Sequence, residues 1–204
     1  MKYLRDILFN SGVGAIYGSA DLVIKSLHQD SRSVRPGSLF FAVRGTASDG
    51  HVFIGKAIEA GAAAIVCEEL PGNLEKEVTY CVVPDSTRAM GIVASNFYGN
   101  PSARMKLIGV TGTNGKTTTA TLLEELFTSL GYKTGLVSTI LYRINGKEIP
   151  STHTTPDSIT LNSMFARMVE EGCSHCFMEV SSHAVVQNRI AGLTFCGGIF
   201  TNLT

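Results

Sequence analysis

Short apolar runs alternate along the chain with stretches in which apolar residues recur every three or four positions. Apolar runs of four to six residues predict buried strands, and the three-to-four spacing predicts amphipathic helices. Strands that alternate with helices are typical of an α/β fold with a mostly parallel sheet. The predicted strands cover residues 39–43, 63–67, 80–83, 107–108, 134–138, 175–180 and 198–201, with a hairpin over 141–149 that turns at Asn145-Gly146. The predicted helices cover residues 2–11, 53–60, 86–97, 117–130 and 156–171.

The pattern breaks once, at Tyr98-Gly99-Asn100-Pro101-Ser102, where glycine, proline and polar residues follow one another. This segment predicts a boundary between a first domain, residues 1–100, and a second domain, residues 101–204. About a hundred residues follow the break, fewer than a doubly wound nucleotide-binding domain normally needs. We therefore expect the second domain to be truncated at its carboxyl side.

Composition narrows the class of protein. The 204 residues are 44% hydrophobic and 17% charged, which is ordinary for a folded domain and argues against disorder. The net charge is zero, so no general positive field attracts nucleic acid or an acidic membrane. The charged start does not resemble a signal peptide, no apolar run is long enough for a membrane span, and the five cysteines lie mostly in apolar segments. We expect a cytoplasmic protein with reduced thiols.

The strongest chemical signal is the segment Gly109 to Thr119, GVTGTNGKTTT, between a predicted strand and a predicted helix. Glycines allow backbone N–H groups to close around phosphate groups, and the helix N-terminus adds a partial positive charge. In such loops the lysine, here Lys116, reaches the β- and γ-phosphates and the next hydroxyl, here Thr117, binds Mg²⁺. Val110 stands where the strict motif has glycine, so the sequence predicts a variant phosphate loop.

Glu179 ends the apolar strand pattern over residues 175–180. Ligands of parallel sheets bind at the carboxyl ends of the strands. A carboxylate there, together with Thr117, would make a Mg²⁺ site. A solvent-facing or ion-paired acid is the alternative.

Polar residues gather in further segments. Ser181-Ser182-His183 follows Glu179, but no G-x-S-x-G turn supports a hydrolase, and Arg189 favours an anion-binding loop. His153-Thr154-Thr155-Pro156 stands at a predicted helix N-terminus, with Thr155 as the cap, and also suits ligand oxygens. In the first half, the polar segments 30–32 and 44–51 flank a strand and suit either a phosphate or uridine pocket or simple turns.

Two other patterns do not point to a cofactor. Gly12 to Gly18 resembles a dinucleotide-binding fingerprint, but its last glycine is one place late and a predicted helix precedes it. Cys173 and Cys176 resemble half of a zinc site without a second pair of ligands.

Taken together these motifs resemble the Mur ligases, and among them the MurE type. The resemblance covers all 204 residues. The motifs that carry it are residues 30–40, 49–51, 111–119, 153–156 and 179–183. The MurF type is similar at residues 30–32 and at the phosphate loop, whereas residues 153–156 and 179–183 favour MurE.

The resemblance implies a small α/β UDP-binding domain followed by the first part of a phosphate-loop ATPase domain with a mostly parallel sheet. It also implies that Lys116, Glu179 and His183 carry the chemistry and that Thr117 and Glu179 hold Mg²⁺. The implied ATP-binding residues are Gly112, Thr113, Asn114, Gly115, Lys116, Thr117 and Thr118. The implied substrate-binding residues are Gln29, Ser31, Thr46, Ala47 and Ser48 for UDP, and His153, Thr154, Thr155, Ser181, Gln187 and Arg189 for the muramoyl-peptide.

The implied reaction is an ATP-dependent amide ligation in peptidoglycan synthesis. The γ-phosphate moves to the terminal carboxylate of UDP-N-acetylmuramoyl-L-alanyl-D-glutamate, and the amine of diaminopimelate or lysine attacks the acyl phosphate. In the family an Asp-His pair, a carboxylated lysine and a third domain follow this segment, so we expect the present chain, a monomer, not to turn over alone. The rivals are a non-catalytic UDP-sugar or nucleotide-binding module, a MurF-type ligase and an amidotransferase partner subunit; a GTPase is disfavoured because no N-K-x-D motif is present.

Overall fold

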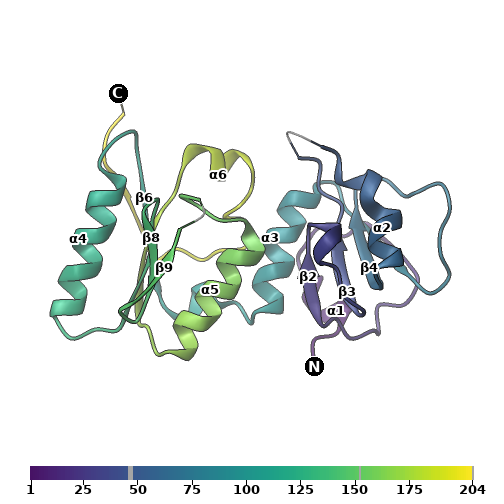
Figure 1. Cartoon of the computed structure of the whole chain (residues 1–204), viewed down its shortest axis with the longest axis horizontal. Helices are drawn as coiled ribbons and strands as arrows, with labels where there is room; N and C mark the ends of the chain where they lie inside the picture. Colours follow the sequence, from purple (N-terminus) through teal and green to yellow (C-terminus); the bar gives the residue numbers. More distant parts are fainter. Residues whose placement is uncertain (46–47, 152, 204) are drawn as a thin grey trace. The chain divides into compact units, whose positions relative to one another are not determined.

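The computed structural model describes residues 1–45, 48–151 and 153–203. The chain divides into two compact units, Met1–Phe97 and Tyr98–Thr204, and each has its own mostly parallel sheet (Figure 1). The predicted α/β class is confirmed. Among the described residues, none of the helices combines the length and the apolar character that a membrane crossing requires.

The sheet of the first unit has five strands in the order β1-β5-β4-β3-β2. Only the β1–β5 pair is antiparallel, so the carboxyl ends of β2 to β5 lie at one edge of the sheet. The strands are β1 (Ala15–Tyr17), β2 (Ser26–His28), β3 (Ser38–Phe41), β4 (Ala62–Cys67) and β5 (Thr79–Val82). The helices are α1 (Leu4–Ile7), α2 (Ile54–Glu59) and α3 (Ser86–Phe97), with short 3₁₀ turns η1 (Ser31–Ser33) and η2 (Gly50–Phe53).

The inner strand β3, between β4 and β2, explains the continuous apolar run over residues 39–43 of the sequence. All four of its residues are buried, because helices cover both faces of a parallel sheet. Successive side chains of a strand point to opposite faces. Phe40 packs in one buried cluster with Ala57 of α2, so Leu39 and Phe41 face the other side.

The sheet of the second unit has six strands in the order β11-β6-β10-β7-β8-β9. The four strands β11, β6, β10 and β7 are parallel, and the hairpin β8–β9 continues the sheet in antiparallel fashion. The strands are β6 (Lys106–Thr111), β7 (Thr134–Val137), β8 (Leu141–Ile144), β9 (Lys147–Pro150), β10 (His175–Glu179) and β11 (Gly197–Phe200). The other elements are α4 (Lys116–Ser129), α5 (Ser158–Glu170), α6 (Ser182–Val186) and η3 (Pro101–Arg104).

Two buried clusters fill the two faces of this sheet. On one face Ala120 of α4 packs with Leu136 and Phe177 of the strands. On the other face Phe165 of α5 packs in a cluster that contains Met178. Figure 1 shows α4 and α5 on opposite sides of the strands. The sheet therefore lies between two helical layers. Because both faces are covered, a ligand can reach the sheet at the ends of its strands.

The strand register aligns the carboxyl ends of β6, β10 and β11. Glu179 of β10 pairs with Val110 of β6, and Phe200 of β11 pairs with Thr111. The phosphate loop follows β6 directly. The segments that follow β6, β10 and β11 thus leave the sheet side by side at its carboxyl edge.

Two predicted helices differ from the structure. The first one, predicted over residues 2–11, is limited to α1, because Asn10 and Gly12 adopt positive φ values of 57° and 80° that a right-handed helix does not allow. The helix predicted to begin at Pro156 begins at Ser158 instead. Its cap is Asp157, whose carboxylate accepts hydrogen bonds from two N–H groups of the first turn, and the predicted cap Thr155 is wrong.

Candidate functional site

The phosphate loop runs from β6 into α4 through two glycines with positive φ. Gly112 has φ +131° and Gly115 has φ +83°, conformations that residues with a side chain rarely adopt. The Lys116 ammonium donates hydrogen bonds to the backbone oxygens of Gly112 (2.8 Å) and Thr113 (2.9 Å). The lysine therefore lies along the loop at the end of β6.

The loop also presents the N-terminus of α4, a helix of 14 residues. The N-cap is Gly115, so no side chain caps the first turn. The first N–H groups of a helix have no partner within the helix and favour an anion. The local structure is thus suited to bind phosphate groups.

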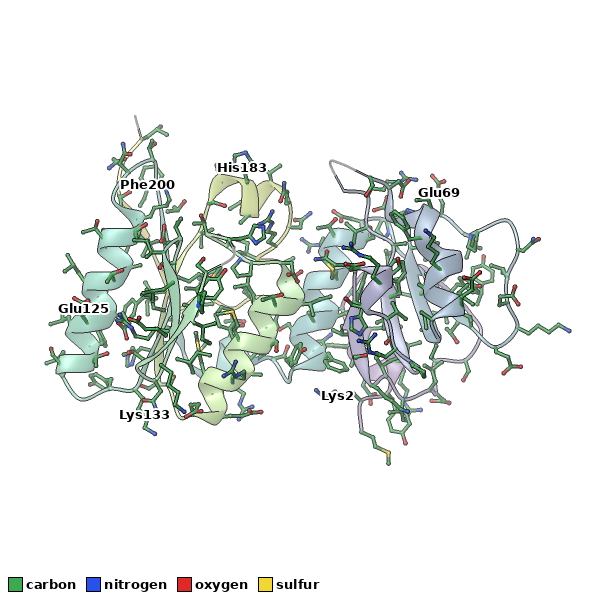
Figure 2. The ribbon with its side chains drawn as sticks, viewed as in Figure 1. Lys2, Glu69, Glu125, Lys133, His183 and Phe200 are labelled. Carbon is green, nitrogen blue, oxygen red and sulfur yellow. The ribbon has the colours of Figure 1, made fainter. Side chains whose placement is uncertain are left out.

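A cavity of about 700 Å³ lies over this loop. Its lining combines the loop with the segments after β7, β9, β10 and β11. It includes all three residues expected to carry the chemistry, Lys116 of the loop and Glu179 and His183 outside it. Figure 2 shows His183 and Phe200 at the same end of this unit, opposite Lys133, which precedes β7. The lining residues are Thr111 to Thr117, Thr139, Thr154, Glu179, Ser181, Ser182, His183, Phe200 and Leu203.

Glu179 is 1% exposed, and its carboxylate is oriented by one neighbouring residue. The Thr139 N–H donates to Oε1 (2.8 Å), and the Thr139 hydroxyl lies 3.3 Å from Oε2 and 3.0 Å from the hydroxyl of Thr154. Thr139 is not among the site residues predicted from the sequence. The one signal in the sequence was its place as a polar residue directly after the strand predicted over residues 134–138. That signal does not connect Thr139 with Glu179, because β7 and β10 become neighbours only in the folded sheet.

The polar segments around residues 153–156 and 181–189 are connected by hydrogen bonds. The Thr155 hydroxyl donates to the Glu179 carbonyl (3.0 Å), and Arg189 donates to the Thr155 carbonyl (2.7 Å) and to the side chain of Gln187 (2.9 Å). The Ser181 hydroxyl accepts from the Ala184 N–H and caps α6. These contacts fix both segments beside the cavity.

Two of the predicted site residues, His153 and Thr118, do not line the cavity, whereas Thr154 and Ser181 do. His153 is exposed, and its backbone carbonyl accepts a hydrogen bond from the Tyr142 hydroxyl (2.6 Å). Thr118 follows Thr117 on α4 and is exposed. Within the part of the chain that the structure describes, the cavity lining does not contain His153, Thr155, Gln187 or Arg189.

The UDP-binding residues expected in the first unit lie after β2 and β3. Gln29 is exposed, Ser31 begins η1, and Ser48 accepts a backbone hydrogen bond from Gly45 (3.0 Å). Thr46 and Ala47 lie outside the described residues. Because β2 and β3 are parallel neighbours, the two segments leave the same edge of the sheet.

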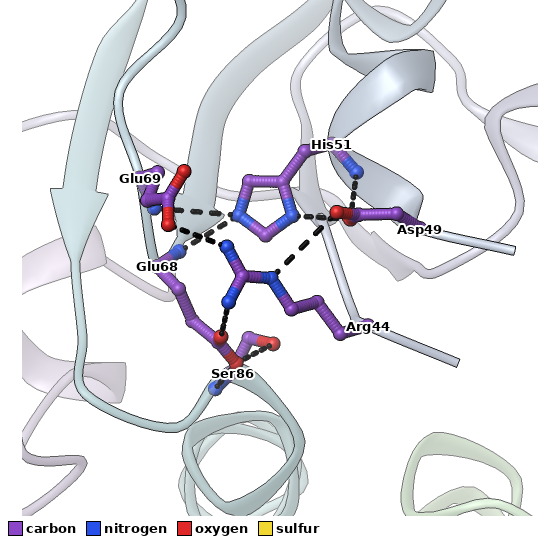
Figure 3. A network of polar contacts seen from close by, with 6 residues as sticks. All are labelled: Arg44, Asp49, His51, Glu68, Glu69 and Ser86. Atoms are coloured by element: carbon purple, nitrogen blue, oxygen red, sulfur yellow. Dashed lines mark hydrogen bonds and ion pairs between the residues drawn. The ribbon is translucent and has the colours of Figure 1, made fainter. Parts of the chain in front are cut away.

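A polar network holds the loop after β3 against the end of β4 (Figure 3). Arg44 contacts three carboxylates, among them Glu69 at 2.6 Å. His51 Nε2 accepts from the Glu68 N–H (3.0 Å), which leaves Nδ1 to donate to Asp49 (2.6 Å). Hydrogen bonds from His51 and the nearby Arg44 charge hold the pKa of Asp49 below its usual value.

Four of the five cysteines are buried, and Cys196 is exposed. Burial raises the pKa of the Cys67 thiol to about 11 and that of Cys81 to about 12. Among the described residues, no group of three or more His, Cys, Asp or Glu side chains is arranged to hold a metal ion.

Two sequence profiles of one family together match most of the chain. The Mur ligase family catalytic domain matches residues 23–98, and the Mur ligase middle domain matches residues 110–204. The chain belongs to the Mur ligase family. The two matches fall in the two units of the structure, one in each.

Two curated relatives of the chain carry the same name. UDP-N-acetylmuramoyl-L-alanyl-D-glutamate--2,6-diaminopimelate ligase of Cytophaga hutchinsonii is 54% identical over 203 residues, which is 98% of this chain and 42% of that protein. The ligase of the same name from Parabacteroides distasonis is 54% identical over 201 residues, 98% of this chain and 41% of that protein. The chain therefore spans about two fifths of the length of the curated relatives it matches.

Solved structures agree with the fold. A structure of UDP-N-acetylmuramoyl-L-alanyl-D-glutamate--2,6-diaminopimelate ligase superposes with a TM-score of 0.83 at 25% identity, over 100% of this chain and 41% of that one. MurF ligase from Thermotoga maritima in complex with ADP superposes with a TM-score of 0.55 at 26% identity, over 79% of this chain and 33% of that one.

Proposed function

We propose that this chain supplies the substrate-binding and ATP-binding parts of an ATP-dependent ligase. The full protein would join diaminopimelate to UDP-N-acetylmuramoyl-L-alanyl-D-glutamate in the cytoplasm. The observation that carries the proposal is the cavity over the phosphate loop, which also contains Glu179, Thr154 and His183. The names of the two relatives from Cytophaga hutchinsonii and Parabacteroides distasonis favour diaminopimelate over lysine as the added amino acid.

In this proposal the phosphate loop and α4 bind the nucleotide. The N–H groups at the start of α4 and the Lys116 ammonium would neutralise the phosphates, since phosphoryl transfer depends mainly on positioning and charge stabilisation. Residues 153–156 and 181–189 would receive the muramoyl-peptide, with Arg189 held in place by Gln187 and Thr155. Gln29, Ser31 and Ser48 of the first unit would bind UDP, together with Thr46 and Ala47, which lie outside the described residues.

The oxygens at the cavity fit a magnesium ion. Mg²⁺ takes oxygen ligands and is usually bound by one or two carboxylates together with phosphates and water. Among the described residues, the Glu179 carboxylate accepts hydrogen bonds from the N–H and the hydroxyl of Thr139 alone, so lone pairs remain for a cation. Glu179 and the Thr117 hydroxyl would hold the ion, which when bound supplies charge neutralisation at the transferred phosphate; His183 would support the site.

Titration calorimetry on the 204-residue chain tests the two binding functions separately. Ser31→Ala should weaken binding of the UDP-muramoyl-dipeptide and leave Mg·ATP affinity unchanged, whereas Lys116→Ala should do the reverse. A folded chain that binds neither ligand would refute the proposal. A non-catalytic binding module would give the same titrations, so turnover must be measured on the full-length protein.

A further inference from the structure

The segment that follows β11 contacts the phosphate loop through a set of hydrogen bonds that neither the motif nor the proposed function explains. Because β11 pairs in parallel with β6, Thr201 and Asn202 leave the sheet directly beside Gly112, Thr113 and Asn114. The backbone carbonyl of Asn202 accepts from the Thr113 N–H (3.0 Å). Segments about 90 positions apart are thus joined at the loop.

The side chain of Asn202 matches the peptide groups of Asn114. Its Oδ1 accepts from the Asn114 N–H (3.0 Å), and its Nδ2 donates to the Asn114 carbonyl (3.2 Å). A carboxamide carries one acceptor and two donors in a plane, so it can bind the N–H and the C=O of one residue together. Asn114 is therefore held on both sides of its Cα.

Thr201 adds a second contact to the same carbonyl. Its hydroxyl lies 2.7 Å from the Asn114 oxygen and 3.2 Å from the Thr111 oxygen. A Cβ at position 112 would overlap the Thr201 hydroxyl and come within 3.0 Å of the Asn202 backbone. The loop and the segment 201–202 are therefore packed as one unit, and only glycine fits at the contact.

We propose that Asn202 and Thr201 are positioning residues of the phosphate loop. Asn114 immediately precedes Gly115, the left-handed residue from which α4 starts, so a fixed Asn114 fixes the direction in which the first-turn N–H groups point. A loop ordered before binding costs less conformational entropy when the triphosphate arrives. The proposal rests on nucleotide binding at this loop.

The test is Mg·ATP affinity of the 204-residue chain, measured by titration calorimetry on variants whose fold is checked by circular dichroism. Loss of one loop hydrogen bond of about 1 kcal/mol corresponds to roughly a five- to tenfold weaker affinity. We expect that loss for T201V, which keeps the shape of threonine without its hydroxyl, and at least that loss for N202A, which removes two side-chain hydrogen bonds to Asn114. T201S keeps the hydroxyl and removes only the methyl group, so its affinity should stay within about twofold of the wild type. If Thr201 acted only through packing of its methyl group, T201S would bind as weakly as T201V.

The matched control is N73A, because Asn73 is an exposed asparagine in the first unit. Equal affinity of N202A, T201V and the wild type would overturn the proposal, and so would T201S as weak as T201V. Tighter binding by N202A would also overturn it, since the Asn202 side chain would then compete with phosphate for the Asn114 N–H group. If the folded wild type binds no Mg·ATP, the nucleotide site itself is refuted, which is a separate outcome.

Discussion

Backbone groups orient the polar side chains around the cavity. Arg189 donates to the carbonyl of Thr155, and the Thr155 hydroxyl donates to the carbonyl of Glu179. Glu179 in turn accepts from the N–H of Thr139. A side chain held by a backbone group keeps its position when a neighbouring side chain changes. Replacing the side chain of Thr155 or Arg189 should therefore leave the other side chains of this set in place, because each is held by a backbone group.

The thiols give a test at the residue scale. Cys196 is exposed, whereas the other four cysteines are buried and burial raises the pKa of Cys67 and Cys81 to about 11 and about 12. Only a thiolate attacks a disulfide reagent, so a buried thiol with a raised pKa reacts slowly. We expect one thiol of the native chain to react rapidly with a chromogenic disulfide at pH 8, and five in denaturant.

Cys196→Ser is the control for this assignment. The variant should lose the fast phase and keep four thiols that react only after unfolding. A fast phase that persists in Cys196→Ser would mean that one of the buried thiols is accessible in the native protein.

At the scale of elements, strong local patterns predicted the structure well. The helix over residues 86–97 has the predicted bounds, since its apolar spacing is regular and Asp85 accepts a hydrogen bond from the Arg88 N–H at its start. The phosphate loop likewise lies between a strand and a helix as predicted. Local sequence contains the information for both features.

Elements that depend on distant partners were missed. The strands β1 and β2 have three residues each and exist through pairing with β5 and β3. The contacts of Thr139 and Asn202 to the site also require strand order, because β7, β10, β6 and β11 are neighbours only after folding. Thr155 was mistaken for a helix cap because Asp157, two residues later, has the same capping chemistry.

The cap of α5 can be tested directly. Asp157→Ala removes the acceptor for the N–H groups of Ile159 and Thr160, both 3.0 Å away. We expect the free energy of unfolding, measured with urea, to fall by about 1 kcal/mol. Asp157→Ser keeps a capping oxygen and should stay close to the wild type. Equal losses in the two variants would show that the capping bonds are not the cause.

A second element-scale test concerns the contact between α4 and the β8–β9 hairpin. Glu124 of α4 is 1% exposed and accepts hydrogen bonds from Arg143 (2.5 Å) and Thr134 (2.6 Å). Arg143→Met would leave a buried carboxylate without its charged partner, which typically costs about 3–5 kcal/mol of unfolding free energy. Urea unfolding of Arg143→Met should show a loss of this size.

Glu148 provides the matched control for the Arg143 variant. Its carboxylate also pairs with Arg143, at 2.9 Å, but its side chain is 60% exposed. Exposed pairs contribute about 0–1 kcal/mol, so Glu148→Gln should change stability little. Replacing Glu124 by Met in the Arg143→Met background should recover part of the loss, because no buried charge then remains. No recovery would indicate that packing, not charge, causes the effect.

At the scale of the whole molecule, each unit buries its own apolar clusters. Phe40 lies in a cluster of the first unit and is 0% exposed, and Phe177 lies in a cluster of the second and is 2% exposed. The two family profiles also match one unit each. Each unit has the buried core that an independently folding domain requires.

Removal of one core aromatic should therefore destabilise one unit selectively. Phe→Ala in a core costs about 3–5 kcal/mol, a large part of the 5–15 kcal/mol that stabilises a typical domain. In hydrogen exchange followed by mass spectrometry, Phe40→Ala should accelerate exchange in peptides from residues 1–97 and leave those from residues 98–203 unchanged. Phe177→Ala should give the opposite pattern. Accelerated exchange throughout the chain in either variant would show that the two units unfold as one cooperative structure.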